Sequence, residues 1–96
     1  MAEYRLSPAA QRDLDAIFDY TAAEWGVSQA FHYIDLIEAG CIASAEAPLT
    51  AVACDHLRPG YRRRTVQRHV IYFRPQAWGA AIIRILSDRM DAEHHL

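Results

Sequence analysis

The first part of the chain carries apolar residues at the three- and four-residue spacing of an amphipathic helix, with acidic side chains on its other faces. Ser7 is suited to cap the first turn, and Pro8 fits the first helical position, where a missing N–H costs nothing. Gly26 is placed to end this helix. The apolar stripe, which we expect to face the core, consists of Ala10, Leu14, Ile17, Phe18, Thr21 and Trp25.

A second run with the same period follows, and Ser28 is placed to cap it. Gly40 lies within this run and weakens the helix by roughly 1 kcal/mol relative to alanine. Pro48 closes the run, because proline cannot continue a helix. Only a few residues separate the two helices, so we expect an antiparallel hairpin. The repeating positions are Ala30, Ile34, Ile37, Cys41 and Ala45.

The second half changes to short segments rich in β-branched and aromatic residues, which predict β-strands. Gln67 and Arg68 form the expected turn between the first two strands, and Pro75–Gly79 links the second to the third. Tyr4–Leu6 is a further short candidate strand. This order indicates an α+β fold, with a short N-terminal strand and an antiparallel helical hairpin packed on a small antiparallel β-sheet. The three later strands are Tyr61–Val66, His69–Arg74 and Ala80–Leu86.

The length of 96 residues predicts a single domain over residues 1–96, with one core of useful size. The hydrophobic set makes up 52% of the chain, which excludes a disordered protein. All ten basic residues are arginine, so the chain has no lysine to form a Schiff base, to bind phosphate in a P-loop or to act as a nucleophile.

The charge is distributed unevenly along the chain. Residues 1–55 hold two arginines and nine acids, whereas residues 56–96 hold eight arginines and three acids. The halves therefore carry formal charges of −7 and +5, within a total of −2. This asymmetry predicts either a polyanionic or acidic partner for the basic half, or mutual neutralisation of the two halves within the fold.

The sequence gives no sign of export or of a membrane span. The N-terminus lacks the charged and apolar regions of a signal peptide, and no segment approaches the roughly 18 apolar residues that a span needs. Cys41 and Cys54 are too few for a disulfide framework and fit a reducing compartment. We therefore expect a cytoplasmic protein without a membrane partner.

The densest basic feature is Arg58–Arg64, where four arginines occur in seven residues beside a Pro-Gly turn. Strand alternation sends Arg62 and Arg64 to one face. It sends Tyr61 and Arg63 to the opposite face. Guanidinium groups bind phosphates and carboxylates through paired hydrogen bonds, so this segment is a candidate binding surface. The alternative is a solvated strand whose arginines pair with the acidic helix faces.

Arg84 interrupts an apolar strand, and at strand period it should share a face with Ile82 and Leu86. A charge in a buried strand must be paired, so one interpretation is a structural ion pair with an acid of a helix. The other interpretation places Arg84 in a groove lined by the open face of the sheet.

Histidine, arginine and tyrosine are the residue types that an RNA-cleaving site would use as base, acid and phosphate-binding cation. One such set consists of His69, Arg62, Arg74 and Tyr72. No spacing rule links these residues, so the signal is weak. The segments around Cys54 and His94 lack the four ligands at recognisable spacing that a structural zinc site needs. No phosphate loop or hydrolase motif occurs, and we expect no cofactor.

Six short motifs follow one another along nearly the whole chain, namely Tyr4-Arg5-Leu6-Ser7, Asp13-Leu14-x-x-Ile17, Trp25-Gly26-x-x-Gln29-Ala30, Arg58-Pro59-Gly60-Tyr61-Arg62, His69-x-x-Tyr72-Phe73-Arg74 and Arg84-Ile85-Leu86-x-x-Arg89-Met90-Asp91. Together they resemble the ParE branch of the RelE/ParE toxin superfamily, whose fold is a helical hairpin on a small antiparallel sheet. The chain departs from the family pattern at Ser87, where histidine is frequent, and at Gln67, where a turn glycine is usual.

The resemblance implies a toxin of a type II toxin–antitoxin system that binds and poisons DNA gyrase without being an enzyme. It also implies a ParD-like antitoxin, assembly into heterotetramers or larger complexes, and no direct reading of nucleic acid. The alternative is a RelE-like endoribonuclease, which cuts ribosome-bound mRNA with a set that includes lysines and a C-terminal tyrosine. This chain has no lysine and no tyrosine after Tyr72.

The basic half and the resemblance together predict the surface that contacts the target or the antitoxin. An apolar groove along the hairpin and sheet edge is expected to accept a wrapping antitoxin segment, whose carboxylates would meet the basic strand. The expected contact residues are Arg58, Tyr61, Arg62, Arg63, His69, Arg74, Arg84, Arg89, Met90 and Asp91.

Overall fold

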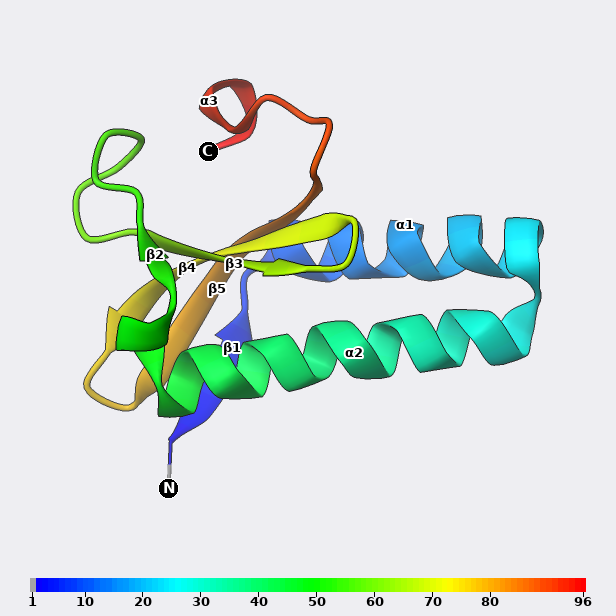
Figure 1. Cartoon of the computed structure of the whole chain (residues 1–96), viewed down its shortest axis with the longest axis horizontal. Coiled ribbons are helices and arrows are strands. Elements are labelled where there is room, and N and C mark those ends of the chain that lie inside the picture. Colours follow the sequence, from blue (N-terminus) through cyan, green and yellow to red (C-terminus); the bar gives the residue numbers. More distant parts are fainter. Residues whose placement is uncertain (1) are drawn as a thin grey trace.

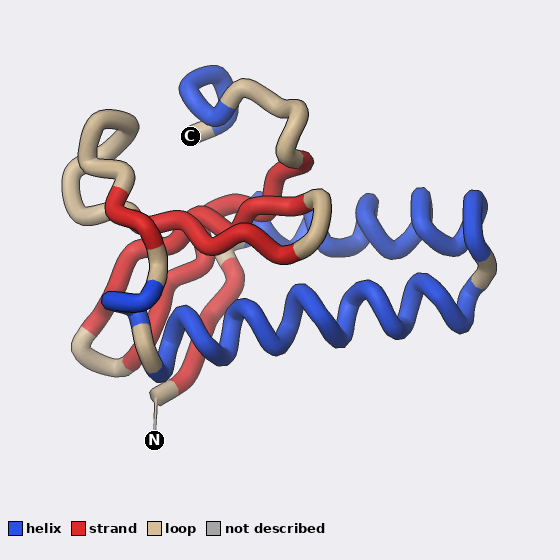
Figure 2. Tube along the Cα trace, in the orientation of Figure 1, coloured by secondary structure: helices blue, strands red, loops and turns tan. Residues whose placement is uncertain are grey.

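A computed structural model describes residues 2–96 and places a hairpin of two long helices on one face of a five-stranded sheet (Figure 1). The elements are β1 (Glu3–Leu6), α1 (Pro8–Trp25), α2 (Val27–Glu46), the 3₁₀ turn η1 (Pro48–Thr50), β2 (Val52–Ala53), β3 (Arg62–Val66), β4 (His69–Gln76), β5 (Gly79–Ser87) and α3 (Ala92–His95). The strand order across the sheet is β1-β5-β4-β3-β2. Figure 2 shows the strands in red, gathered beside one end of the blue helical hairpin. The predicted α+β architecture is confirmed.

The sheet is mixed, whereas the sequence predicted an antiparallel one. Strands β2 to β5 pair antiparallel, but β1 pairs parallel with β5, from Glu3 opposite Gly79 to Leu6 opposite Ile82. The whole helical hairpin lies between β1 and the later strands, and a parallel pairing needs a long connection of this kind. β1 therefore completes the sheet at the β5 edge.

The strand boundaries differ at one turn. β4 continues to Gln76 and β5 starts at Gly79, so the turn contains Ala77 and Trp78 instead of the predicted Pro75–Gly79. Pro75 is tolerated in the strand because β3 pairs with β4 only as far as Phe73, which leaves this part of β4 without a neighbour on that side. β2 and α3 were not predicted, since two and four residues are too short for a periodic pattern.

The ends of α1 follow the predicted capping signals. The Oγ of Ser7 accepts a hydrogen bond from the Ala10 amide at 3.0 Å, and Gly26 ends the helix with φ of 93°. The predicted cap at Ser28 is wrong. Gly26 is the single connecting residue, so it also occupies the N-cap position of α2, which begins at Val27. This short connection forces the two helices to run antiparallel.

The main core lies between the hairpin and the sheet. Its buried side chains include Ala10, Ile17, Ile37, Cys41, Ile71, Phe73, Ile82 and Ile85. Gly40 allows α2 to approach the sheet, because a Cβ there would lie 2.6 Å from Val66 Cγ2 and 2.8 Å from Ile71 Cδ1. Gly40 weakens the isolated helix, but it allows α2 to pack closely on the sheet.

The end of the hairpin extends beyond the sheet (Figure 1). Trp25, which the helical stripe assigned to the core, is 73% exposed, so that prediction is wrong. The helical period of α1 continues past the last strand that could cover it. Phe18 packs edge-on against Phe31 with ring centroids 5.1 Å apart, and this contact joins the two helices where the sheet does not support them.

The other face of the sheet is also covered. Val70, Tyr72, Leu86 and Cys54 form a second buried cluster, against which Leu57, Tyr61, Ala92 and Leu96 pack. The residues before β3 and the C-terminal segment with α3 therefore form a third layer. This arrangement buries four consecutive residues of β4, Val70–Phe73, so the part of the sheet beside Arg84 is covered on both faces.

A β-bulge alters the predicted alternation at Arg84. Tyr72 lies opposite Arg84 while the adjacent Phe73 lies opposite Ile82, so one extra residue is inserted in β5 between these pairs. Ile82 therefore packs in the main core, whereas Leu86 packs in the second cluster. Arg84 shares a face with Leu86, as predicted, but not with Ile82.

Gly79→Ala should lower the free energy of unfolding by about 3 kcal/mol. Gly79 has φ of 146°, and a Cβ there would lie 1.8 Å from the Glu3 carbonyl oxygen, so alanine must push β1 away from β5. Gly60→Ala is the matched control, since its φ is 82° but the space around it is open, and it should cost about 1 kcal/mol. Urea denaturation followed by circular dichroism measures both; equal losses would contradict the close approach of β1.

Candidate functional site

The start of α1 is fastened to the part of β5 that β1 does not reach. β1 pairs with β5 only as far as Ile82. Beyond it, the Ser7 hydroxyl donates a hydrogen bond to the Ile83 carbonyl at 2.7 Å, and Asp13 Oδ2 accepts one from the Ile85 amide at 2.9 Å. Side chains from the first turns of α1 thus replace the missing strand.

Asp13 also holds Arg84 in a two-pronged ion pair. The Arg84 Nε lies 2.7 Å from Asp13 Oδ2, and its Nη2 lies 2.8 Å from Oδ1. This pairing raises the pKa of Arg84. The same guanidinium donates to the His95 carbonyl at 3.0 Å and so ties α3 to the sheet. The ion-pair interpretation of Arg84 is therefore confirmed.

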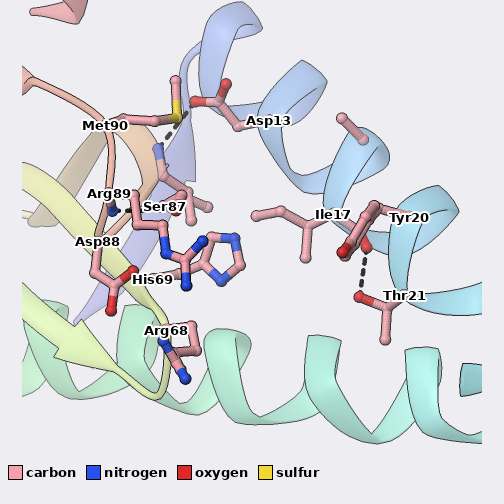
Figure 3. A pocket seen from close by; sticks show the side chains of 12 residues that line it. Asp13, Ile17, Tyr20, Thr21, Arg68, His69, Ser87, Asp88, Arg89 and Met90 are labelled. Atoms are coloured by element: carbon pink, nitrogen blue, oxygen red, sulfur yellow. Dashed lines mark hydrogen bonds between the residues drawn. The ribbon is translucent and has the colours of Figure 1, made fainter. Parts of the chain in front are cut away.

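A groove of about 570 Å³ lies between α1 and the end of β5, and we call it the α1–β5 groove (Figure 3). One wall is formed by α1, the other by β5 and the residues after it, and the β3–β4 turn closes one side. Its apolar lining comes from Ile17, Ile85 and Met90. Its polar lining includes Tyr20, Thr21, Arg68, His69, Ser87, Asp88 and Arg89.

The proton positions on His69 follow from its partners. The Tyr33 hydroxyl accepts a hydrogen bond from the Arg68 amide at 3.2 Å and lies 2.7 Å from His69 Nδ1. The 2.7 Å distance fits donation in either direction, and the Tyr33 oxygen already accepts from the Arg68 amide, so we take the Tyr33 hydroxyl as the donor. We therefore assign the hydroxyl hydrogen to Nδ1 and the ring hydrogen to Nε2. Burial lowers the pKa of His69, against a smaller opposing effect of Asp88 and Asp13, and so favours the neutral ring.

The polar end of the groove is more basic than acidic. Arg68 and Arg89 are exposed cations, and Asp88 is an exposed acid beside them. The charge of Asp13 is matched by Arg84. The Asp88 amide donates to the Arg68 carbonyl at 2.8 Å, which keeps the β3–β4 turn next to the residues that follow β5. In Figure 3 the side chains of Arg68, His69 and Arg89 gather at this end.

A second hollow of about 360 Å³ lies beneath the protruding half of the hairpin, and we call it the hairpin hollow. Thr21 lines both this hollow and the α1–β5 groove, so the two are neighbours at this residue. The hairpin hollow has no acidic or arginine side chain in its lining, which consists of Thr21, Trp25, Gln29, His32, Tyr33, Leu36 and Gln67. The combined surface is thus basic at one end and uncharged at the other.

The structure divides the predicted contact residues among three places. His69, Arg89 and Met90 line the α1–β5 groove. A second group surrounds the C-terminal segment, where Arg58 donates to the Leu96 carbonyl at 2.9 Å and Tyr61 packs in the second cluster. Asp91 belongs to this group as the N-cap of α3, and its carboxylate lies 3.0 Å from His94 Nδ1.

The third group lies on β3 and β4. Arg62 donates to the Ala51 carbonyl, and Arg64 donates to Ser44 Oγ and to the Ala47 carbonyl, so both hold the segment after α2. The alternative pairing of these arginines with acidic helix faces is not seen within residues 2–96. Arg63 and Arg74 are exposed and remain candidates for contact with another molecule.

The set of residues considered for RNA cleavage does not come together. Tyr72 packs in the second cluster, whereas His69 lies beside Tyr33 on the hairpin side of β4. Within the described part of the chain, no three histidine, cysteine or acidic side chains are grouped to hold a metal ion. Over the same residues, no helix is both long and apolar enough to cross a membrane.

Sequence reasoning missed three residues that shape the groove. Arg68 was treated as a turn residue, although its position next to His69 was a usable signal. Tyr33 lies outside the apolar stripe of its helix, and its contact with His69 joins positions 36 residues apart. Asp13 belongs to the motif Asp13-Leu14-x-x-Ile17, but this motif does not show that its carboxylate pairs with Arg84 on a distant strand.

Asp13→Ala should lower the free energy of unfolding by about 3 kcal/mol, because Arg84 and the Ile85 amide both lose their partner. The side chains of Asp13 and Arg84 are only 14% and 22% exposed, so water replaces the lost contacts poorly. Asp19→Ala, on an exposed position of the same helix, should change stability by less than about 0.5 kcal/mol. Chemical denaturation compares the two variants, and similar values for both would refute the role of Asp13.

The stability of the protein should decrease as the pH falls from 7.5 to 5.0, in part through His69. Its folded-state pKa lies below the ordinary 6.5, so the unfolded chain binds the proton more readily in that range. The contribution of neutral His69 to the free energy of unfolding is present above pH 6.5 and is lost as the pH falls below it. His69→Asn keeps an acceptor for Tyr33 but does not titrate. The variant should therefore lose less of its free energy of unfolding over the same pH range. Denaturation curves at both pH values test this; an equal loss would contradict it.

The comparisons with known proteins agree with one another. A family model for the ParE toxin of the type II toxin–antitoxin system parDE matches residues 4–92. Toxin ParE1 of Caulobacter vibrioides is 40% identical over 96 residues, which cover 100% of this chain and 99% of that protein. Toxin ParE1 of Mycobacterium tuberculosis is 38% identical over 96 residues, covering 99% and 98%. Toxin ParE of Escherichia coli is 34% identical over 94 residues, covering 95% and 89%.

A solved structure has a similar fold. A chain of the chromosomal ParDE TA system from P. aeruginosa matches with a TM-score of 0.76 and 22% identity, covering 91% of this chain and 96% of that one. The identity is low, so this likeness concerns the fold alone. The family model and the relatives extend over almost the whole sequence, and the chain therefore belongs to the ParE toxin family of type II toxin–antitoxin systems.

Proposed function

We propose that this protein poisons DNA gyrase by direct binding, without catalysing a reaction, and that a ParD-like antitoxin neutralises it. The observation that carries the proposal is similarity to ParE toxins along the full chain, at 38–40% identity to two proteins named Toxin ParE1. The place of action is the cytoplasm, and the toxin and antitoxin assemble as a heterotetramer or a larger complex.

The α1–β5 groove and the adjoining hairpin hollow support the antitoxin part of the proposal. Together they give a concave surface with apolar and basic parts, which suits a segment that orders as it binds. The large exposed side chains of Tyr20, at 67%, and Trp25, at 73%, border this surface. Exposed aromatic residues beside a groove are typical of a protein-binding site.

The gyrase part rests on the exposed arginines of the sheet. Arg63 and Arg74 make no hydrogen bond through their side chains to other groups within residues 2–96, so they are available to a partner. Other arginines of the basic half hold the C-terminal segment or the end of α2, which gives them a structural role. We assign Arg63 and Arg74 to the contact with gyrase. Direct reading of nucleic acid is not part of this function.

The endoribonuclease alternative has less support. His69 and Tyr72 are directed to opposite faces of the sheet, so they cannot act on one phosphate. The chain also has no lysine, which the RelE set uses.

Purified toxin should inhibit the supercoiling of relaxed plasmid by gyrase, and cleaved plasmid should accumulate. Arg63→Gln combined with Arg74→Gln should raise the toxin concentration needed for half inhibition by about tenfold, because two exposed charged contacts are removed. Arg12→Gln removes one exposed arginine from α1 and is the control, which should behave like the unchanged toxin. Gel electrophoresis of the plasmid products measures all three.

Undiminished supercoiling at excess folded toxin would contradict gyrase poisoning. Primer extension on transcripts from cells that express the toxin tests the alternative in parallel. Cuts at fixed codon positions would favour a ribosome-dependent endoribonuclease, and intact transcripts would argue against one.

A further inference from the structure

We propose that the basic end of the α1–β5 groove is a carboxylate-binding subsite, formed by Arg68, His69 and Arg89, which holds an aspartate or glutamate side chain of the antitoxin. The inference rests on the proposed function for the identity of the partner. The subsite itself follows from the geometry of the groove.

The Tyr33 hydrogen bond determines what His69 offers to a ligand. Tyr33 occupies Nδ1 at 2.7 Å, so the Nε2–H is the donor left for the groove. Tyr33 is itself fixed by the Arg68 amide at 3.2 Å, and its ring packs edge-on against the imidazole, with centroids 5.4 Å apart. The donor is thus held in place before any ligand arrives, which reduces the entropy lost on binding.

The net charge around the subsite favours a ligand with a single negative charge. Arg68 and Arg89 supply two positive charges, and Asp88 supplies one negative charge next to them. Asp13 also lines the groove, but its charge is matched by Arg84. The remaining charge of one matches a carboxylate, whereas a phosphate with nearly two negative charges would meet stronger repulsion from Asp88.

The surface next to the subsite defines the rest of the ligand. Ile17, Ile85 and Met90 offer apolar contact within the same groove. Beyond Thr21, the hairpin hollow continues without acidic or arginine side chains. A matching antitoxin segment therefore carries its acid at the Arg68–Arg89 end and apolar side chains along the hairpin.

A small-molecule titration tests the subsite without any antitoxin. Blocked glutamate, with acetylated and amidated ends, should shift the NMR signals of His69 and of the Arg68 and Arg89 side chains. Blocked glutamine has the same shape without the charge and should leave these signals unchanged. The variant with Arg68→Gln and Arg89→Gln should show no response to either compound.

Two results of this titration would overturn the proposal. Equal shifts with glutamate and glutamine would exclude recognition of the charge. Saturation by inorganic phosphate at a lower concentration than by blocked glutamate would assign the subsite to phosphate groups instead.

Binding to the antitoxin encoded beside the toxin tests the partner. The same double variant should bind it at least about tenfold more weakly, because two charge-assisted contacts are lost. Arg12→Gln is the matched control, since Arg12 is exposed on α1 but lies outside the groove lining, and it should bind normally. Calorimetry with purified proteins gives both dissociation constants.

The outcomes separate the subsite from the broader function. If the antitoxin binds the unchanged toxin and the double variant equally well, the subsite is wrong while the toxin–antitoxin proposal stands. If the antitoxin does not bind the unchanged toxin, the proposed function fails and the glutamate titration still decides the subsite. Dimers of the toxin alone that disappear in the double variant would assign the groove to a second copy of the chain.

Tyr33→Phe isolates the positioning role of the hydroxyl. This variant keeps every charge but leaves His69 Nδ1 without its partner, so the ring hydrogen becomes free to occupy either nitrogen. Long-range nitrogen NMR should show a mixture of the two neutral forms, together with weaker glutamate binding. An unchanged ring form with unchanged binding would show that Tyr33 does not orient His69.

Discussion

The carboxylate of Asp13 connects three parts of the structure that the chain itself keeps far apart. It accepts the backbone amide of Ile85 and both prongs of Arg84, and Arg84 in turn holds the carbonyl of His95. α1, β5 and α3 therefore meet at one acidic group. This acceptor is needed because β1 ends at Leu6, opposite Ile82, and the last five residues of β5 have no strand on that side. A strand edge without hydrogen-bond partners is costly to bury, and Asp13 supplies the acceptor that a longer β1 would have provided.

This attachment also determines where the concave surface lies. Near Ser7 and Asp13 the helix is held directly against β5, whereas a few turns later it has passed the end of the sheet (Figure 1). The space that opens between them is the α1–β5 groove, and the hairpin hollow lies next to it beneath the hairpin. The exposed Trp25 belongs to the same geometry, because the hairpin protrudes where no strand supports it. Exposed aromatic side chains of this kind are unusual on a core helix, and here they border the surface that we propose as a binding site.

The sequence predicted the elements well and the contacts between distant elements poorly. Ser7, Pro8 and Gly26 act through their own local conformation, so the ends of α1 could be read from the chain. The turn at Gln67 was also found, and its φ of 54° explains why glycine is usual there among ParE toxins. The parallel pairing of β1 and the choice of Asp13 depend on positions more than 70 residues apart, and the bulge in β5 depends on its register with β4. No periodic pattern carries such information, and the same holds for Tyr33 and His69.

The opposite charges of the two halves of the chain neutralise each other only in part when the chain folds. Among the arginines of residues 56–96, Arg84 forms an ion pair with an acid of the first half within the described residues, while Arg58, Arg62 and Arg64 donate to neutral groups. The acids on the outer faces of the helices thus keep their charge, as do Arg63, Arg68, Arg74 and Arg89. Neutral partners leave a guanidinium positive, so these arginines stabilise the fold without cancelling the charge of their half. The basic character therefore persists after folding at two separate places, the sheet surface and the basic end of the α1–β5 groove.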